Sequence, residues 1–184
     1  MLFRTSVAIA SAYLVMVLCS PGASAQDNPV VVMETSMGTI TIELFQEQAP
    51  ISVENFLAYV DEEHYDNTIF HRVIQTFMIQ GGAFSPDMRG KPVRASIKNE
   101  ATNGMKNDKY TVAMARTSEV DSATDQFFIN TVDNNALNHM VRDFGYAVFG
   151  RVTDGTDVVD RIAATPVTNS LPDEPAVIQT VRRR

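Results

Sequence analysis

The chain has 184 residues, of which 45% are hydrophobic and 20% are charged, and its formal net charge is −7 at pH 7. This length suits one domain with a substantial hydrophobic core. The acidic balance disfavours nucleic acid or an anionic membrane as the main partner, and the local triple arginine at 182–184 is expected to form a solvated tail.

The first 25 residues are typical of a secretory signal peptide. They contain one basic residue, Arg4, and no acid, followed by an apolar stretch over 6–19 and by the small residues Ala23-Ser24-Ala25. A membrane anchor would need about 20 apolar residues with flanking charge, and this stretch is shorter. We therefore expect cleavage after Ala25, which would leave residues 26–184 as the mature domain.

Cys19 is the only cysteine of the chain, and it lies inside the predicted signal peptide. The mature chain would then have no thiol for a disulfide, a thiolate nucleophile or a cysteine-based zinc site. A lipid anchor on Cys19 is disfavoured because the bulky Leu18 precedes it where a small residue is expected.

The first half of the mature chain alternates between strand and helix patterns. Residues 31–45 alternate aliphatic and polar side chains around Ser36-Met37-Gly38, which predicts a β-hairpin. Pro50 is tolerated in the first turn of a helix, and the apolar residues after it recur at helical spacing, so we predict a helix over about 50–61. Residues 68–80 are strand-like again.

The second half of the chain contains mostly short strand candidates. Residues 83–109 are rich in Gly, Pro, Asn, Lys and Asp and predict a long surface loop. One further helix is predicted over 156–165, and the strand candidates are 111–115, 126–130, 146–152 and 176–181. Many short strands, two helices and no strand-helix-strand alternation favour an antiparallel barrel or sandwich.

The common catalytic signatures are absent from the sequence. It contains no G-x-S-x-G elbow, no phosphate-binding G-x-x-x-x-G-K-[ST] loop, no G-x-G-x-x-G and no H-E-x-x-H. The three histidines, His64, His71 and His139, do not have metal-ligand spacing, so we expect no metal site. No local pattern supports a Ser-His-Asp triad, which leaves a secreted hydrolase as a remote alternative.

An unusual group of residues remains around a cation in an apolar run. Arg72 lies within FHRVIQTFMIQGG, residues 70–82. The polar residues Gln80 and Gln126 lie close in sequence to the apolar residues Phe77, Met78, Phe127 and Phe128. Strand alternation places Arg72 and Gln80 on one face and His71 on the other, with a break expected at Gln75-Thr76. An apolar pocket with a few convergent polar groups is the usual form of a site for a small ligand or a peptide side chain.

These residues carry a family resemblance. FHRVIQTFMIQGGAF resembles the signature segment of the cyclophilins, and MAR, DQFFIN and FGYAVFGRV are similar to later blocks of the same family, in the same order. The similarity extends from about Val30 to Val181, which is nearly the whole predicted mature chain. FGYAVFG and the short loops are most similar to periplasmic bacterial members, in agreement with the predicted signal peptide.

The resemblance implies a mainly β fold, a closed eight-stranded antiparallel β-barrel capped by two α-helices, and peptidyl-prolyl cis-trans isomerase activity. Together with the predicted signal peptide and the acidic charge balance, it predicts a monomer without cofactor that acts in the periplasm on proline-containing segments of unfolded or partly folded exported proteins, without nucleic acid and without stable membrane association. A non-catalytic prolyl-peptide binding module, or holdase chaperone, is the alternative function.

The resemblance also assigns roles to individual residues. Arg72 and Gln80 would be catalytic, with the guanidinium of Arg72 stabilising the twisted X-Pro bond. The residues expected to bind the substrate are Phe77, Met78, Ala115, Arg116, Gln126, Phe128, Leu137 and Tyr146. The alternative, purely structural roles are that Phe127 belongs to the core, that Arg72 is a buried ion-pair partner, and that Glu100 and Asp121 brace loops.

Five residues depart from the family pattern. Tyr146 stands where many members have a pocket histidine, and Arg116 stands where Asn is common, which would add charge beside the peptide groove. Ala136 stands at the position of a pocket-rim tryptophan of eukaryotic members, so we expect weak inhibition by cyclosporin. Gln75-Thr76 replaces a Pro-Gly turn, a change expected to loosen the approach to Phe77.

Overall fold

The computed structural model describes residues 28–184, so the predicted signal peptide and its cleavage site lie outside the described residues. Within that range no helix is both long enough and apolar enough to cross a membrane. The strands that form the main sheet are β1 (Val30–Thr35), β2 (Gly38–Leu44), β3 (Thr68–Ile74), β4 (Met78–Gly81), β5 (Thr111–Met114), β6 (Phe127–Asn130), β7 (Val148–Asp154) and β10 (Val177–Arg183).

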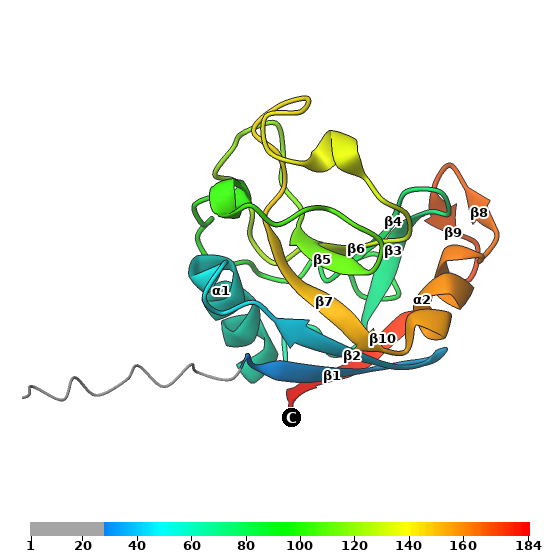
Figure 1. Cartoon of the computed structure of the whole chain (residues 1–184). Helices are drawn as coiled ribbons and strands as arrows, with labels where there is room; N and C mark the ends of the chain where they lie inside the picture. Colours follow the sequence, from blue (N-terminus) through cyan, green and yellow to red (C-terminus); the bar gives the residue numbers. More distant parts are fainter. Residues whose placement is uncertain (1–27) are drawn as a thin grey trace, which may run out of the picture.

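These eight strands form a closed antiparallel barrel in the order β1-β10-β3-β4-β6-β5-β7-β2 (Figure 1). Helices α1 (Pro50–Asp61) and α2 (Thr156–Ala163) lie on opposite sides of the strands in this view. Closure leaves the sheet without a free edge, because every strand of the barrel is hydrogen-bonded to a neighbouring strand on each side. The predicted fold class is confirmed.

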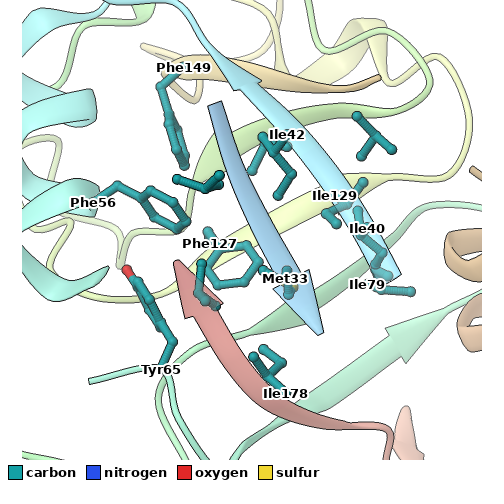
Figure 2. Packing of buried hydrophobic residues seen from close by; sticks show 14 of the residues in the cluster. Met33, Ile40, Ile42, Phe56, Tyr65, Ile79, Phe127, Ile129, Phe149 and Ile178 are labelled. Atoms are coloured by element: carbon teal, nitrogen blue, oxygen red, sulfur yellow. The ribbon is translucent and has the colours of Figure 1, made fainter. Parts of the chain in front are cut away.

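Alternation along the strands separates an inner core from an outer surface. Ile40, Ile42 and Leu44 of β2 are fully buried, as the alternating pattern of 31–45 predicts. Figure 2 shows aromatic rings from α1, β6 and β7 packed among the strand aliphatics of the interior. Phe56 contacts Phe127 and Phe149 at ring-centroid distances of 5.6 and 5.2 Å, so Phe127 is a core residue, as expected.

The helix over 50–61 has the predicted bounds, and it is capped from a distant part of the chain. The carboxylate of Glu100 accepts hydrogen bonds from the backbone N–H groups of Ile51 (3.0 Å) and Ser52 (2.7 Å). An anion at a helix N-terminus satisfies donors that have no partner inside the helix. Glu100 therefore braces the long loop against α1, and Asp121 braces the same loop by accepting from the backbone N–H of Asn99 (2.9 Å).

Several boundaries differ from the sequence-based prediction. The segment 68–80 is two strands joined by a turn at 75–77, and the strand predicted from 146 begins at Val148. The long loop contains a short 3-10 helix, Ala101–Asn103, and an isolated two-stranded sheet of β8 (Val167–Thr168) and β9 (Leu171–Pro172) was not predicted.

The prediction of a solvated arginine tail is wrong for two of its three residues. Arg182 and Arg183 belong to β10, and their guanidiniums lie 2.6 Å from the carboxylates of Asp66 and Asp61, respectively. The hydrogen bond from Arg182 lowers the pKa of Asp66, and the hydrogen bond from Arg183 lowers the pKa of Asp61. These ion pairs fasten the last strand of the barrel to the segment around the end of α1.

A second apolar cluster lies on the outer face of β4, β5 and β6, and this cluster positions the site. Its buried members are Phe45, Met78, Ala113, Phe128, Leu137 and Val148. Because side chains alternate across a strand, Met78 and Phe128 face outward while their neighbours Ile79 and Phe127 face the barrel interior. The outer face is therefore apolar where a soluble barrel is normally polar.

Candidate active site

A pocket of about 230 Å³ opens on this outer apolar face. Its lining residues come from β3, β4 and β6, from the turn between β3 and β4, and from the loops after β5 and β6: Arg72, Phe77, Met78, Gln80, Ala115, Arg116, Phe128, Leu137, Arg142 and Tyr146. All the residues predicted for the site line this pocket except Gln126, which is one hydrogen bond away from it. Arg142, which was not predicted from the sequence, lines the pocket as well.

A β-bulge in β3 aims Arg72 at the pocket. Phe70 pairs with Gly81 and Arg72 pairs with Gln80, so both His71 and Arg72 oppose Gln80. As a result Phe70 and Val73 both face the barrel core, which simple alternation does not allow for residues three apart. The expectation that His71 points to the face opposite Arg72 therefore fails. Besides the expected turn at 75–77, β3 contains a bulge at His71-Arg72, which was not predicted.

Arg72 is part of a short chain of polar side chains. Its Nη1 donates to Oε1 of Gln80 at 3.3 Å, and Nε2 of Gln80 donates to Oε1 of Gln126 at 2.8 Å. The side chain of Arg72 is exposed, and among residues 28–184 no carboxylate lies within ion-pair distance of it. The alternative of a buried ion-pair partner is therefore wrong for Arg72, whose charge faces the pocket.

His71 lies beside this chain and is half-buried. Its ring packs edge-on against Phe84 with a centroid distance of 4.9 Å. Burial, and more weakly the neighbouring charge of Arg72, lowers the pKa of His71 from its ordinary value of 6.5. A neutral imidazole beside Arg72 adds no positive charge to this side of the pocket at neutral pH.

The turn that carries Phe77 is held firmly although it lacks the Pro-Gly pair. The side-chain hydroxyl of Thr131 donates to the carbonyl of Gln75 (2.9 Å), and its backbone N–H donates to the carbonyl of Phe77 (3.1 Å). The side chain of Asn134 donates to the same Phe77 carbonyl at 2.6 Å. The predicted loosening near Gln75-Thr76 is therefore offset by three hydrogen bonds from the segment after β6.

Arg116 is buried in the opposite wall rather than adding charge to the groove. Its side chain is 5% exposed, its Nη2 lies 2.8 Å from Oδ1 of Asp143, and its Nε donates to the carbonyl of Gly145 at 3.0 Å. The guanidinium also covers the ring of Tyr146 at 4.6 Å from the centroid. The expected extra charge is thus neutralised by Asp143, and Arg116 holds Tyr146 in the wall.

Tyr146 in turn contacts the floor of the pocket. Its ring meets that of Phe128 edge-on with a centroid distance of 5.7 Å. Phe128, Met78 and Leu137 are each at most 3% exposed, whereas Tyr146 is only partly buried. The apolar floor and the aromatic side wall together form a cavity that is apolar and buried at its base and open at its mouth.

A group of buried asparagines, which the sequence analysis missed, connects the two sides of the pocket. The side chain of Asn130 at the end of β6 donates to Oδ1 of Asn107 (3.3 Å) and accepts from Asn134 (2.7 Å). Asn107 also donates to the carbonyl of Leu137 at 3.2 Å. The asparagine-rich stretch DNNALN was the available signal, but Asn107 lies at least 23 residues away in sequence from the residues that it bonds.

The lining defines what chemistry is accessible here. Within residues 28–184, the pocket lining includes no carboxylate, histidine, serine or cysteine, and no group of three or more His, Cys, Asp or Glu residues is placed to hold a metal ion. Its volume is below the roughly 300–1,000 Å³ that is usual for drug-sized ligands. The pocket therefore suits one compact apolar side chain beside the guanidinium of Arg72 and the amides of Gln80 and Gln126.

Comparison with known proteins agrees with this reading. Residues 30–183 match the family described as "Cyclophilin type peptidyl-prolyl cis-trans isomerase/CLD". The chain is 55% identical over 158 residues to a peptidyl-prolyl cis-trans isomerase of Streptomyces antibioticus, covering 82% of this chain and 95% of the relative. It is 49% identical over 168 residues to peptidyl-prolyl cis-trans isomerase A of Dickeya dadantii, covering 89% and 88%.

A solved structure agrees as well. The crystal structure of a Cryptosporidium parvum cyclophilin type peptidyl-prolyl cis-trans isomerase, determined in the presence of the dipeptide Ala-Pro, is 30% identical in sequence and superposes with a TM-score of 0.74. The match covers 84% of this chain and 98% of that structure.

Proposed function

The chain belongs to the cyclophilin-type peptidyl-prolyl cis-trans isomerases, enzymes that accelerate rotation about X-Pro peptide bonds, and we propose that Arg72 and Gln80 are its catalytic residues. The observation that carries this proposal is the unpaired guanidinium of Arg72 at the edge of a pocket large enough for one apolar side chain. Proline is such a side chain, and rotation about its amide needs no nucleophile.

The reaction opposes amide resonance, which sets a barrier of about 18–20 kcal/mol to rotation about the C–N bond. In the twisted transition state the prolyl nitrogen loses conjugation and gains a lone pair. A guanidinium fixed beside that nitrogen donates to the lone pair in the twisted state and has no equivalent acceptor in either planar state. Such differential binding lowers the barrier.

The polar chain beside Arg72 supplies its orientation. Gln80 accepts from Arg72 and donates to Gln126, so a rotation of the guanidinium away from the pocket would break this sequence of hydrogen bonds. In this proposal Gln126 positions Gln80, while Phe77, Met78, Phe128, Leu137 and Tyr146 hold the proline ring. Ala115 and the backbone of Arg116 bind the extended peptide beside it.

The magnitude of the Arg72 contribution is limited. One charge-assisted hydrogen bond is worth about 1.5–3 kcal/mol, and each factor of ten in rate requires about 1.4 kcal/mol. Arg72 alone therefore supplies about 10- to 100-fold. The remainder comes from holding the proline ring in a fixed pocket while the preceding carbonyl rotates.

The test compares cis-trans exchange in a short Ala-Pro-Phe peptide, measured by NMR, for residues 26–184 and for two variants. Arg72→Ala should lower kcat/KM by about 10- to 100-fold. Arg89→Ala, which removes an arginine whose side chain is 84% exposed and which does not line the pocket, should leave kcat/KM unchanged. A folded Arg72→Ala variant with parental activity would remove Arg72 from the mechanism, and an inactive parent would leave a peptide-binding module.

We further propose that the protein is exported and assists the folding of exported proteins in the periplasm. The support is the leader pattern of residues 1–25, with its apolar stretch and its Ala23-Ser24-Ala25 sequence. The mass of the chain recovered from a periplasmic extract should correspond to residues 26–184. Recovery of the full-length chain from the cytoplasm alone would contradict this localisation.

A further inference from the structure

The arginines of residues 28–184 divide into two groups by their partners. Seven of them have a guanidinium nitrogen within 3 Å of a carboxylate oxygen: Arg89, Arg94, Arg116, Arg151, Arg161, Arg182 and Arg183. The described arginines without so close a carboxylate are Arg72, Arg142 and the C-terminal Arg184. Two of these three line the same pocket, Arg72 and Arg142.

The charge of Arg142 is only weakly paired, because Asp143 is held mainly by other groups. Oδ1 of this carboxylate already accepts from Nη2 of Arg116 and from the backbone N–H of Gly145, both at 2.8 Å. Only Oδ2 faces Arg142, at a longer distance of 3.4 Å. One carboxylate therefore serves two guanidiniums, and the buried Arg116, at 5% exposure, holds it more closely than Arg142, at 60%.

The backbone around Arg142 keeps it at the rim of the pocket. The N–H of Met140 donates to the carbonyl of Asp143 (3.0 Å), and the N–H of Val141 donates to the carbonyl of Asn138 (3.2 Å). His139 Nδ1 lies 2.7 Å from the carbonyl of Phe144. The loop that presents Arg142 is thus closed on itself, so the guanidinium is offered to solvent from a fixed base.

We propose that Arg142 is a specificity-determining residue that favours substrates with Asp or Glu close to the isomerised proline. This inference rests on the proposed function of the pocket and names the substrate class within it. The lining contains three arginines and no carboxylate in the described part of the chain, while the whole chain is acidic, with a net charge of −7. A carboxylate on the bound peptide would complete the incomplete ion pair of Arg142 and would be repelled by most other surfaces of the protein.

The expected preference is modest because the pair is exposed. Ion pairs at solvent-exposed positions contribute about 0.2–1 kcal/mol, which corresponds to a discrimination of about 1.4- to 5-fold. Salt screens such a pair, and the screening length is about 3 Å at 1 M ionic strength. The preference should therefore be visible at low ionic strength and vanish at high ionic strength.

The experiment uses pairs of short proline peptides that differ only by Glu or Gln at one position, either two residues before proline, directly before it, or directly after it. NMR exchange gives the ratio of kcat/KM for the Glu peptide over the Gln peptide. At low salt the parent should show a ratio of about 1.4 to 5 for at least one position. The ratio should fall to one for Arg142→Gln and for the parent at about 1 M salt.

Arg89→Gln is the matched control, since it removes an exposed arginine outside the pocket, and it should keep the parental ratio. A ratio of one in the parent at all three positions would overturn the proposal, and so would an unchanged ratio in Arg142→Gln. Neither result would touch the isomerase assignment, which fails only if the parent does not accelerate exchange in the Gln peptides.

Discussion

The two sides of the pocket are built by different means. The strand side consists of Arg72, Met78, Gln80 and Phe128, which stand on β3, β4 and β6 and are placed by backbone ladders. The loop side consists of Arg116, Leu137, Arg142 and Tyr146, which stand on irregular segments held by side-chain hydrogen bonds. On the strand side many backbone hydrogen bonds share in holding the side chains in position, whereas the loop side depends on Asp143 and a few asparagines.

This difference predicts different responses to substitution. A change on the strand side should act through packing and should be insensitive to salt and to moderate acid. A change on the loop side should act through ion pairs and amide hydrogen bonds, with smaller effects on the free energy of unfolding and larger effects of solution conditions.

Phe128→Ala should have the largest effect on stability. Phe128 is 3% exposed, lies between the ladders of β4 and β5, and contacts Tyr146 across the pocket. Truncation of a buried phenylalanine leaves a cavity and costs about 3–5 kcal/mol. Urea unfolding should show a loss near the lower end of this range, because Phe128 lines the open pocket. Phe128→Leu is the control and should recover most of the loss; a cost below 1 kcal/mol for Ala would contradict the packing argument.

Asn130→Ala should have the next largest effect, because it cuts the connection between the two sides. Asn130 is fully buried, donates to Thr111 Oγ1 (2.9 Å) and Asn107, and accepts from Asn134. Buried partners left without a hydrogen bond cost about 1–3 kcal/mol, so the free energy of unfolding should fall by about 2 kcal/mol. The exposed Asn135 is the matched control, and Asn135→Ala should cost no more than about 0.5 kcal/mol.

The strand side of the pocket could be predicted from the sequence, whereas most contacts of the loop side could not. The inner and outer faces of β2, β4 and β6 follow from alternation, and the strand-side residues lie in two local motifs, so the sequence alone could place them together at the pocket. The Asn107–Asn130 hydrogen bond and the Arg116–Asp143 ion pair join residues 23 and 27 apart, and no local pattern encodes such pairs. The bulge at His71-Arg72 was missed for a related reason, since an extra residue in a strand is defined only by its partner strand.

Asp143→Asn should affect binding more than stability. The substitution removes the charge that pairs with Arg116, although its amide oxygen can still accept from the N–H of Gly145. Because the Asp143 side chain is 42% exposed, solvent screening limits the pair to about 1 kcal/mol or less, and kcat/KM should fall by about two- to five-fold. The loss should appear mainly in KM, as Tyr146 and the rim become less well placed. Asp87→Asn, which breaks a remote exposed pair with Arg89, is the control and should not change KM.

Acidification should separate the two sides through their titrating groups. The hydrogen bond from the Gly145 backbone, and then the charges of Arg116 and Arg142, lower the pKa of Asp143 below its ordinary value of 3.8. The lowered pKa means that the stability contributed by ionised Asp143 is full above about pH 4 and is lost as the pH falls through the folded-state pKa. The KM of the parent should therefore rise only below about pH 4, whereas Asp143→Asn should lack this rise.

His71 should produce the smallest change, and it concerns the strand side. Burial lowers its pKa below 6.5, so the folded protein disfavours the imidazolium. The corresponding stability is full above about pH 6.5 and decreases as the pH falls toward the folded-state pKa, because the unfolded chain binds the proton first. Isomerase activity should consequently stay constant between about pH 8 and pH 6.5, since no imidazolium forms beside Arg72 there.

The urea concentration at the midpoint of unfolding should begin to decrease once the pH is lower than about 6.5. His71→Phe should reduce this decrease, because it removes the titrating ring while keeping an aromatic contact with Phe84. A parental slope that persists in His71→Phe would assign the change to the carboxylates of the loop side and of the pairs with β10, whose lowered pKa values act in the same direction at lower pH.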